Sequence, residues 1–97
     1  MDIRALRYFV EVVKRHSFTK AADALFVTQP TISKMVKQLE EELGTPLFIR
    51  STRQVRLTMA GKVFLDYART IGAFVEKASQ EVAAIVALKT GTLSIGT

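Results

Sequence analysis

One segment in the middle of the chain concentrates side chains that form hydrogen bonds. Residues 29–38 carry hydroxyl, amide and ammonium groups, with no acid before Glu40, and the polar members are Gln29, Thr31, Ser33, Lys34, Lys37 and Gln38. Side chains of these types bond the edges of bases in the DNA major groove or the phosphates beside it. The segment is therefore a candidate contact surface for nucleic acid. A helix face that is merely solvated is the alternative, because the outer faces of helices are generally polar.

Three arginines follow this segment. Arg50, Arg53 and Arg56 lie in and around a polar tip, residues 51–54, which separates two short stretches of strand-like sequence. This pattern predicts a hairpin whose tip projects Arg53. The negative potential of a narrow minor groove favours arginine, which adds affinity more than sequence discrimination. Solvated arginines that protect an exposed strand edge are the alternative.

The inventory of reactive groups argues against an enzyme. The 97 residues include no Cys and a single His, His16, which excludes thiol chemistry, a disulfide framework and a metal centre built on Cys or a His pair. Asp2, Asp23 and Asp66 are scattered over separate elements, and the acidic run 40–42 points around a helix. We expect no catalytic residue, no metal and no cofactor in this chain.

The charge distribution indicates the kind of partner, and the absence of a long apolar run indicates the cellular compartment. The net charge is +5, and residues 1–60 hold ten of the 14 Lys and Arg against six of the 9 Asp and Glu. An anionic partner would therefore meet the first part of the chain. The longest apolar run, residues 82–88, is far shorter than the ~20 residues that span a bilayer, and Asp2, Arg4 and Arg7 interrupt the N-terminus. We expect a cytoplasmic chain with no membrane segment.

Helical periodicity accounts for the elements that must position these side chains. A first helix has its apolar stripe at Ile3, Leu6, Val10 and Val13. A short second helix follows the candidate N-cap Ser17, with apolar residues at Phe18, Ala21, Ala22 and Leu25. A third helix, 29–43, has Thr28 as candidate N-cap, Pro30 in its first turn, Gly44 at its end, and core positions at Ile32, Val36, Leu39 and Leu43. The second and third helices form a helix-turn-helix, in which the N-terminal turns of the second member enter the major groove; Ser17 and Thr19 could then bond phosphates.

The repeat after the hairpin predicts a long helix that begins after the N-cap Thr58. Its apolar residues alternate steps of four and three: Phe64, Ala68, Ile71, Val75, Ala78, Val82 and Ile85. At 1.5 Å per residue, a helix from 58 to about 89 is roughly 45 Å long, which is more than this chain can cover with its own core. A repeat of 3.5 residues is typical of paired helices, so we expect a dimer through this stripe. A stripe that only covers the helix-turn-helix core is the alternative.

Six motifs resemble the N-terminal domain of LysR-type transcriptional regulators. They are Ala-Leu-Arg-Tyr-Phe at 5–9, Ser-Phe-Thr-Lys-Ala-Ala at 17–22, Thr-Gln-Pro-Thr-Ile-Ser-Lys at 28–34, Gln-Leu-Glu-Glu-Glu-Leu-Gly at 38–44, Pro-Leu-Phe at 46–48 and Leu-Thr-Met-Ala-Gly at 57–61. The resemblance covers essentially the whole chain. It implies a mainly α fold, a winged helix-turn-helix of three helices and a two-stranded wing followed by a long dimerising linker helix.

The resemblance also implies a division of the chain. Residues 1–57 would form the winged helix-turn-helix DNA-binding domain and residues 58–90 the linker and dimerisation helix. Residues 91–97, which alternate like the opening of a strand, would be the stub of a missing effector-binding domain. We therefore expect a piece of a longer protein, whose small-molecule effector binds outside this chain.

Pattern and resemblance together give the expected site residues. The DNA-binding set is Ser17, Thr19, Thr28, Gln29, Pro30, Thr31, Ser33, Lys34, Lys37, Arg50 and Arg53, and the dimerisation set is the apolar repeat of the long helix, from Phe64 to Ile85. Two residues depart from the family pattern. Lys34 stands where arginine is common, so that position has a point charge instead of a planar bidentate fork. Ile49 stands where the family usually has an acid, and the sequence assigns it no purpose.

The leading hypothesis is the DNA-binding fragment of a LysR-type regulator of transcription. It would bind a near-palindromic operator in double-stranded DNA as a homodimer, with helix 29–43 in the major groove and the wing on the minor groove or the backbone; a tetramer of the full-length protein stays open. The second hypothesis is a coiled-coil interaction protein, in which residues 58–89 bind a partner chain and the basic surface only keeps the chain soluble. Salt-sensitive binding to duplex DNA distinguishes the two.

Overall fold

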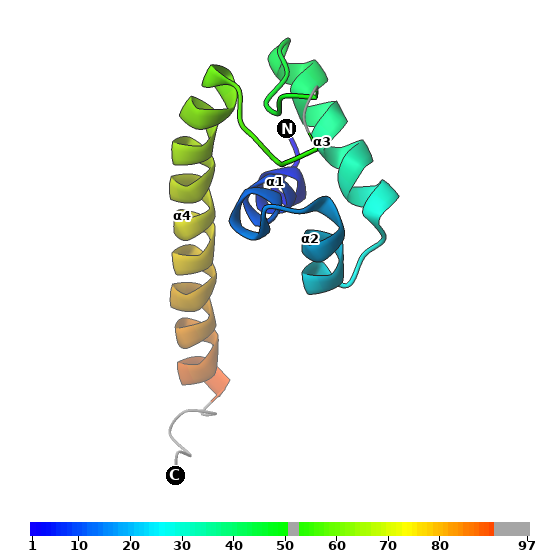
Figure 1. Ribbon diagram of the computed structural model, residues 1–97. Helices are drawn as coiled ribbons and strands as arrows, with labels where there is room; N and C mark the ends of the chain where they lie inside the picture. The colour runs from blue at the N-terminus through cyan, green and yellow to red at the C-terminus, as the bar shows by residue number, and fades with distance from the viewer. Residues whose placement is uncertain (51–52, 91–97) are drawn as a thin grey trace.

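The computed structural model describes residues 1–50 and 53–90 of the chain. Within these residues four helices follow one another: α1 (Ile3–Arg15), α2 (Phe18–Leu25), α3 (Gln29–Leu43) and α4 (Met59–Thr90). Helices α1, α2 and α3 pack together, and α4 runs past α1 and continues alone beyond the packed helices (Figure 1). The expected mainly α fold is confirmed. The segment 91–97, expected to be the stub of a further domain, lies outside the described residues.

Side-chain caps begin three of the helices. Asp2 accepts a hydrogen bond from the Arg4 amide (2.8 Å) at the start of α1, and Ser17 accepts one from the Lys20 amide (3.0 Å) at the start of α2. The hydroxyl of Thr58 accepts a hydrogen bond from the Gly61 amide at 3.0 Å in the first turn of α4. The caps predicted at Ser17 and Thr58 are confirmed.

The start of α3 differs from the expectation. Thr28 occupies the N-cap position with extended backbone, but its side chain makes no capping hydrogen bond. Its hydroxyl instead bonds the hydroxyl of Thr31, with 2.8 Å between the oxygens. Thr28 is therefore the N-cap residue, as predicted. The predicted hydrogen bond from a backbone N–H to its side chain is absent, because the Thr28 hydroxyl bonds the Thr31 hydroxyl instead.

The core lies where α1 meets the other three helices, centred on Phe9. The Phe9 ring is fully buried and lies 5.3 Å from the ring of Phe48 and 5.5 Å from the ring of Phe64, measured between centroids. Buried hydrophobic residues from all the elements complete it: Ala5, Leu6, Val12, Ala21, Ala22, Ile32, Val36, Leu39, Leu47, Leu65 and Ala68.

The stripe predicted for the first helix is partly wrong. Ile3 is 45% exposed, and Val10 and Val13 are half-buried, whereas Phe9 and Val12 are fully buried. The reason is tertiary: α1 contacts α2, α3 and α4, so its buried face is wide and its centre is set by where those helices lie. Leu43 on α3 is also exposed, because the chain turns away at Gly44, which has a positive φ of 76°.

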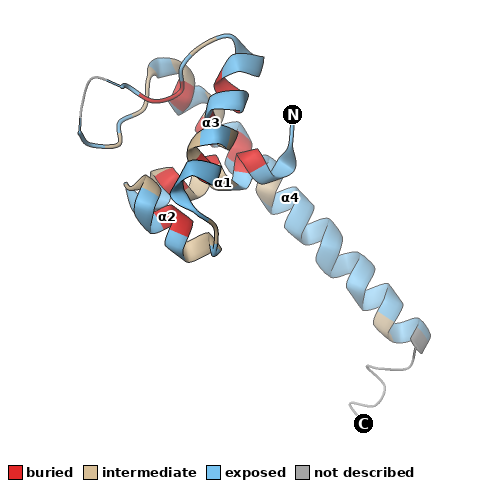
Figure 2. Ribbon diagram, turned by 90° about the vertical axis from the view of Figure 1, so that its right-hand side faces the viewer, coloured by how far each residue is buried: buried red, intermediate tan, exposed pale blue. Residues whose placement is uncertain are grey.

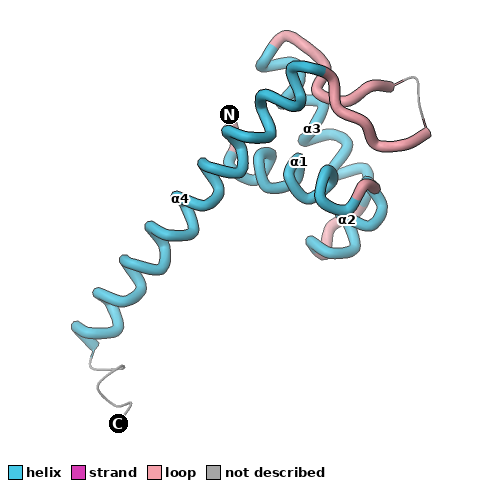
Figure 3. Tube along the Cα trace, turned by 60° about the vertical axis from the view of Figure 1, so that its left-hand side comes forward, coloured by secondary structure: helices cyan, strands magenta, loops and turns pink. Residues whose placement is uncertain are grey.

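The two-stranded wing is not confirmed. The loop between α3 and α4, residues 44–58, contains one antiparallel bridge, Phe48 to Leu57, and no strand is formed by the described part of the chain. The Ile49 amide donates to the Arg56 carbonyl at 2.9 Å, and the Thr58 amide donates to the Leu47 carbonyl at 2.9 Å. Figure 3 shows the loop extending away from the helices.

Packing holds the two arms of this loop against the helices. Leu47 and Phe48 are buried, and the Phe48 ring lies 5.4 Å from that of Phe18 at the start of α2. The first turn of α4 approaches so closely that a Cβ on Gly61 would lie 2.2 Å from the Leu47 carbonyl oxygen. Glycine is therefore required at position 61, and the loop needs no regular ladder to keep its base in place.

Candidate nucleic-acid interface

The outer face of α3 presents the polar residues predicted from the sequence. Gln29, Thr31, Lys34 and Lys37 are exposed together with Pro30, and Ser33 is half-buried, whereas Ile32, Val36 and Leu39 on the opposite face have no exposed surface. The helix thus fixes a polar face by burying its apolar one. Between residues 29 and 38 this face carries donors, acceptors and two positive charges, and no carboxylate.

Hydrogen bonds orient the first turns of that face. The Gln29 amide Nε2 donates to the Ser33 hydroxyl at 2.7 Å, one helical turn further on, and the hydroxyls of Thr28 and Thr31 bond each other. Each of these groups keeps bonding capacity: Gln29 Oε1 can accept, and the Ser33 hydroxyl can still donate. Paired side chains have fewer rotamers to lose when they meet a ligand.

The N-terminus of α2 holds the two hydroxyls expected to meet phosphate. The Ser17 hydroxyl is half-buried and caps the helix, but it can donate a hydrogen bond while it accepts that of the Lys20 amide. Thr19 and Lys20 are exposed. This end of α2 therefore offers hydroxyl groups and positive charge to an anion.

The arginines of the loop divide into two kinds. Arg53 and Arg56 are exposed, and no carboxylate of the described residues forms an ion pair with either of them. Arg50 instead forms an ion pair with Glu40 of α3. Lys34 and Lys37 resemble Arg53 in having no ion-pair partner within residues 1–50 and 53–90. The uncompensated charge of α3 and the α3–α4 loop thus belongs to Lys34, Lys37, Arg53 and Arg56.

Glu40 is a residue that the sequence analysis missed. It was grouped with the acidic run 40–42, but its carboxylate is buried and bonds the loop. The available signal was its spacing, because Glu40 lies four residues after the core residue Val36 and next to the core residue Leu39. A charged residue on an apolar helix face indicates a buried partner.

Three positive groups in or beside α1 are paired with carboxylates. Arg4 donates hydrogen bonds to Asp2, which lowers the pKa of the Asp2 carboxyl and raises the pKa of the Arg4 guanidinium. Arg15 pairs with Glu11 at 2.6 Å, and the N-terminal amine pairs with Glu42 at 3.3 Å. Arg7 and Lys14 are exposed and have no ion-pair partner within residues 1–50 and 53–90, so α1 retains two uncompensated positive charges.

The predicted dimerisation stripe of α4 divides after Ala68. Phe64 is half-buried and Ala68 is buried, both against this chain's own core, while the rest of the stripe is exposed: Ile71, Val75, Ala78, Val82 and Ile85. Figure 2 shows α4 exposed along nearly all of the part that leaves the packed helices. Tyr67 and Phe74, which the predicted stripe does not include, are each 66% exposed and add to the apolar surface of α4.

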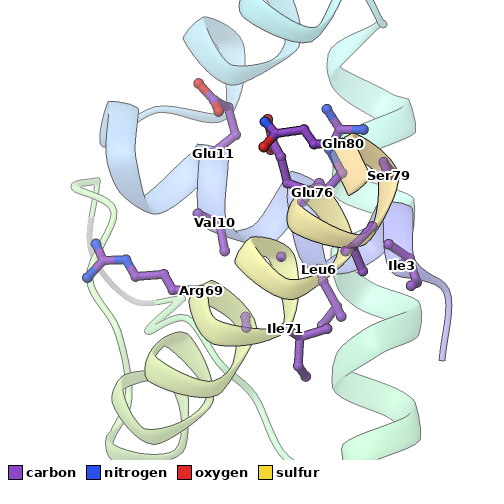
Figure 4. A pocket seen from close by; sticks show the side chains of 13 residues that line it. Ile3, Leu6, Val10, Glu11, Arg69, Ile71, Glu76, Ser79 and Gln80 are labelled. Carbon is purple, nitrogen blue, oxygen red and sulfur yellow. The ribbon is translucent and has the colours of Figure 1, made fainter. Parts of the chain in front are cut away.

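A groove of about 640 Å³ runs between α1 and α4. Ile3, Leu6 and Val10 line it from α1, and Ile71 and Val75 are among the residues that line it from α4. Figure 4 shows Leu6 beside Ile71, with the polar side chains of Glu76 and Gln80 further along α4. The groove therefore joins the exposed part of the α4 stripe to the surface of α1.

The described residues contain neither a cluster of metal ligands nor a membrane-spanning helix. No group of three or more His, Cys, Asp or Glu lies close enough together there to hold a metal ion. None of the helices in residues 1–50 and 53–90 combines the length and the apolar character needed to cross a membrane.

Comparison with known proteins gives a consistent result. The family model described as bacterial regulatory helix-turn-helix protein, lysR family, matches residues 3–62. The transcriptional regulator BudR of Klebsiella aerogenes is 48% identical over 96 residues, which is 99% of this chain and 67% of BudR. BenM of Acinetobacter baylyi is 52% identical over 68 residues, 70% of this chain, but the match spans only 22% of BenM.

Solved structures give the same result. A complex of the BenM DBD with catB site 1 DNA superposes with a TM-score of 0.84 at 43% identity, over 89% of this chain and 97% of that one. A CbnR DBD–DNA complex superposes with a TM-score of 0.80 at 36% identity, over 89% and 99% of the two chains. Against full-length BenM, the similarity covers 82% of this chain and 26% of the other.

Proposed function

Since the chain belongs to the LysR family of bacterial regulatory helix-turn-helix proteins, we propose that it binds double-stranded DNA in a sequence-specific manner and so directs transcription. The observation that carries this proposal is the outer face of α3 between residues 29 and 38, where hydroxyl, amide and ammonium groups are exposed without a carboxylate. The DNA complexes of the similar BenM and CbnR domains support it. The proposal needs no catalytic residue, metal or cofactor in this chain.

The N-terminal turns of α3 would enter the major groove. Gln29 and Ser33 then bond base edges, because an amide and a hydroxyl can each donate and accept. Lys34 and Lys37 bond phosphates or acceptor atoms of bases as point charges. Thr28, Pro30 and Thr31 lie at the same N-terminal end of α3 and contact the DNA there. Ser17 and Thr19 bond a phosphate at the start of α2.

The α3–α4 loop would lie on the minor groove or on the backbone. Arg53 is the contact residue, because it is exposed and has no ion-pair partner in the described part of the chain. Arg50 is paired with Glu40, and we leave it out of the contact set.

The exposed half of α4 supports a homodimer. Val82 and Ile85 are 59% and 56% exposed, and no other helix of the described residues covers them. Burying such side chains against a second copy stabilises a dimer by about 25 cal/mol for each Å² of apolar surface removed from water. A two-fold dimer places two α3 helices on a near-palindromic operator. A small-molecule effector would act through a further domain of a longer cytoplasmic protein.

A coiled-coil interaction protein is the second candidate, and the apolar surface of α4 favours it. Binding of labelled duplexes of random sequence, followed by selection and sequencing of the bound fraction, tests the two. DNA binding requires selection of a common half-site and affinity that falls steeply with salt. An absence of binding at low salt would refute the proposed function and leave the second candidate.

A matched pair of variants distinguishes binding through α3 from non-specific attraction between DNA and a basic protein. Lys34→Ala and Lys77→Ala each remove one exposed positive charge, from α3 and from α4 respectively. If α3 meets the duplex, Lys34→Ala weakens binding, with a salt slope shallower by up to about one unit, and Lys77→Ala changes neither quantity. Equal losses for the two variants would indicate non-specific attraction to a basic chain.

A further inference from the structure

Glu40 is the one charged residue that is buried in the described part of the chain. It lies on α3, two residues after the exposed face proposed to meet DNA, and its side chain is 10% exposed. An ionised carboxylate taken out of water is strongly destabilising unless it is paired and hydrogen-bonded. The position therefore requires specific partners.

Those partners all belong to the α3–α4 loop. Glu40 Oε2 accepts hydrogen bonds from the backbone amides of Leu47 (2.7 Å) and Phe48 (3.2 Å). Glu40 Oε1 accepts one from the Arg50 guanidinium. Both oxygens of the carboxylate are thus occupied, and three donors from residues 47–50 converge on one side chain of α3.

These bonds connect the two parts of the proposed DNA interface. The Phe48–Leu57 bridge and the bond from the Ile49 amide to the Arg56 carbonyl tie the second arm of the loop to the first. The first arm is tied in turn to Glu40. Burial of Leu47 and Phe48 holds the loop against the core, but the hydrophobic effect is non-directional and does not orient the backbone. Hydrogen bonds are directional, so the placement of Arg53 relative to α3 depends on the bonds to Glu40.

The ion pair between Glu40 and Arg50 also affects the charge that α3 presents to DNA. A lone carboxylate on α3 would repel the phosphates that the same helix approaches. The Arg50 guanidinium cancels this charge, although Arg50 remains half exposed, with 56% of its side chain accessible. Neutralising Glu40 is thus a role for Arg50 that requires no contact with DNA.

Resting on the proposed function, we propose that Glu40 is a positioning residue for DNA binding and that Arg50 is its counter-ion instead of a phosphate contact. Glu40 fixes the α3–α4 loop, and with it Arg53, at the distance from α3 that one duplex requires. Arg50 neutralises Glu40 and completes its hydrogen bonds.

A double-mutant cycle on the intact chain tests this assignment. The variants are Arg50→Ala, Glu40→Gln and the pair combined, measured by fluorescence anisotropy on the selected duplex. Arg50→Ala is expected to weaken binding by about tenfold in the wild-type background, because residues of one hydrogen-bond network are coupled to this extent. In the Glu40→Gln background the same change is expected to cost about twofold or less, since no carboxylate is left unpaired.

The salt dependence separates a counter-ion from a phosphate contact. Arg50→Ala is expected to leave the slope of log affinity against log salt unchanged, whereas Arg53→Ala makes it shallower by about one unit. A slope reduced by about one unit for Arg50→Ala, with equal losses in both backgrounds, would overturn the proposal. Circular dichroism melts fix a temperature at which every variant is folded.

Two further measurements keep the result interpretable. Arg50→Lys retains the charge at Glu40 and is expected to retain most of the affinity. Hydrogen exchange without DNA should show faster exchange of the Leu47 and Phe48 amides in Arg50→Ala than in wild type, and unchanged exchange would count against the positioning role.

If the wild-type chain bound no duplex, the proposed function itself would fail. Normal wild-type binding together with the slope loss would refute only the roles of Glu40 and Arg50.

Discussion

Replacing Gly61 by alanine tests how the first turn of α4 fixes the base of the α3–α4 loop. The new Cβ would lie 2.2 Å from the Leu47 carbonyl oxygen and 3.0 Å from Leu57 Cδ2. The Leu47 carbonyl is held by the Thr58 amide at 2.9 Å, and the Thr58 hydroxyl both caps α4 and donates to the Pro46 carbonyl at 2.8 Å. Neither side of the contact can move without breaking one of these bonds.

The size of the effect follows from two opposing terms. A clash between backbone and Cβ belongs at the upper end of the cost of overpacking, about 3 kcal/mol, and the better helix propensity of alanine offsets about 1 kcal/mol of it. The net loss of about 2 kcal/mol corresponds to a melting temperature lower by roughly 8–16 °C for a domain of this size. The loop carries Arg53, so the affinity for DNA should fall as well.

Thermal melts followed by circular dichroism at one protein concentration measure this. The matched control is Gly72→Ala in the same helix, where a new Cβ meets nothing within 4 Å inside the chain. The control should be stabilised by roughly 0.5–1 kcal/mol, because only the helix propensity changes. A Gly61→Ala protein that melts at or above the wild-type temperature would refute the close approach of α4 to Leu47.

Four further substitutions test separate features. Phe26 is 94% exposed with a positive φ of 57°, so Phe26→Asn should raise the free energy of unfolding by up to about 1 kcal/mol, and a lower melting temperature would contradict this. Val82→Glu should convert a dimer into a monomer in sedimentation experiments, because it would bury an unpaired charge; a wild-type chain that is already monomeric at tens of micromolar would exclude the dimer through α4. Gln29→Ala should cost about 1–3 kcal/mol on the selected duplex and little on random DNA, and equal losses on both would reduce Gln29 to a positioning contact. The pKa of Asp2 is lowered by its hydrogen bonds from Arg4, so its stabilising effect is present above the ordinary aspartate pKa of about 3.9 and is lost as the pH falls through the lowered value; Asp2→Asn should remove this dependence from acid melts, and an unchanged acid profile would show that the ionised carboxylate of Asp2 does not contribute.

The sequence by itself determined the features that depend on neighbours along the chain. The third helix was expected at 29–43 and spans Gln29–Leu43, and the caps at Ser17 and Thr58 are formed as predicted. Helix periodicity, capping hydroxyls and a glycine at a helix end act over a few residues, so one sequence contains all the information they need. The polar face of α3 followed from the same periodicity, and the family followed from six motifs along the chain.

Only the tertiary structure decided which surfaces are covered and which charges are paired. The buried face of α1 centres on Phe9 because three helices pack around it, and a single helical stripe cannot show where those helices lie. Glu40 and Arg50 meet across a chain reversal, so their pairing depends on how the loop folds back on α3. The stripe of α4 divides after Ala68 because the core of this chain ends there. In each case the deciding contact joins residues of different elements, and burial depends on the three-dimensional packing of those elements, which local periodicity does not determine.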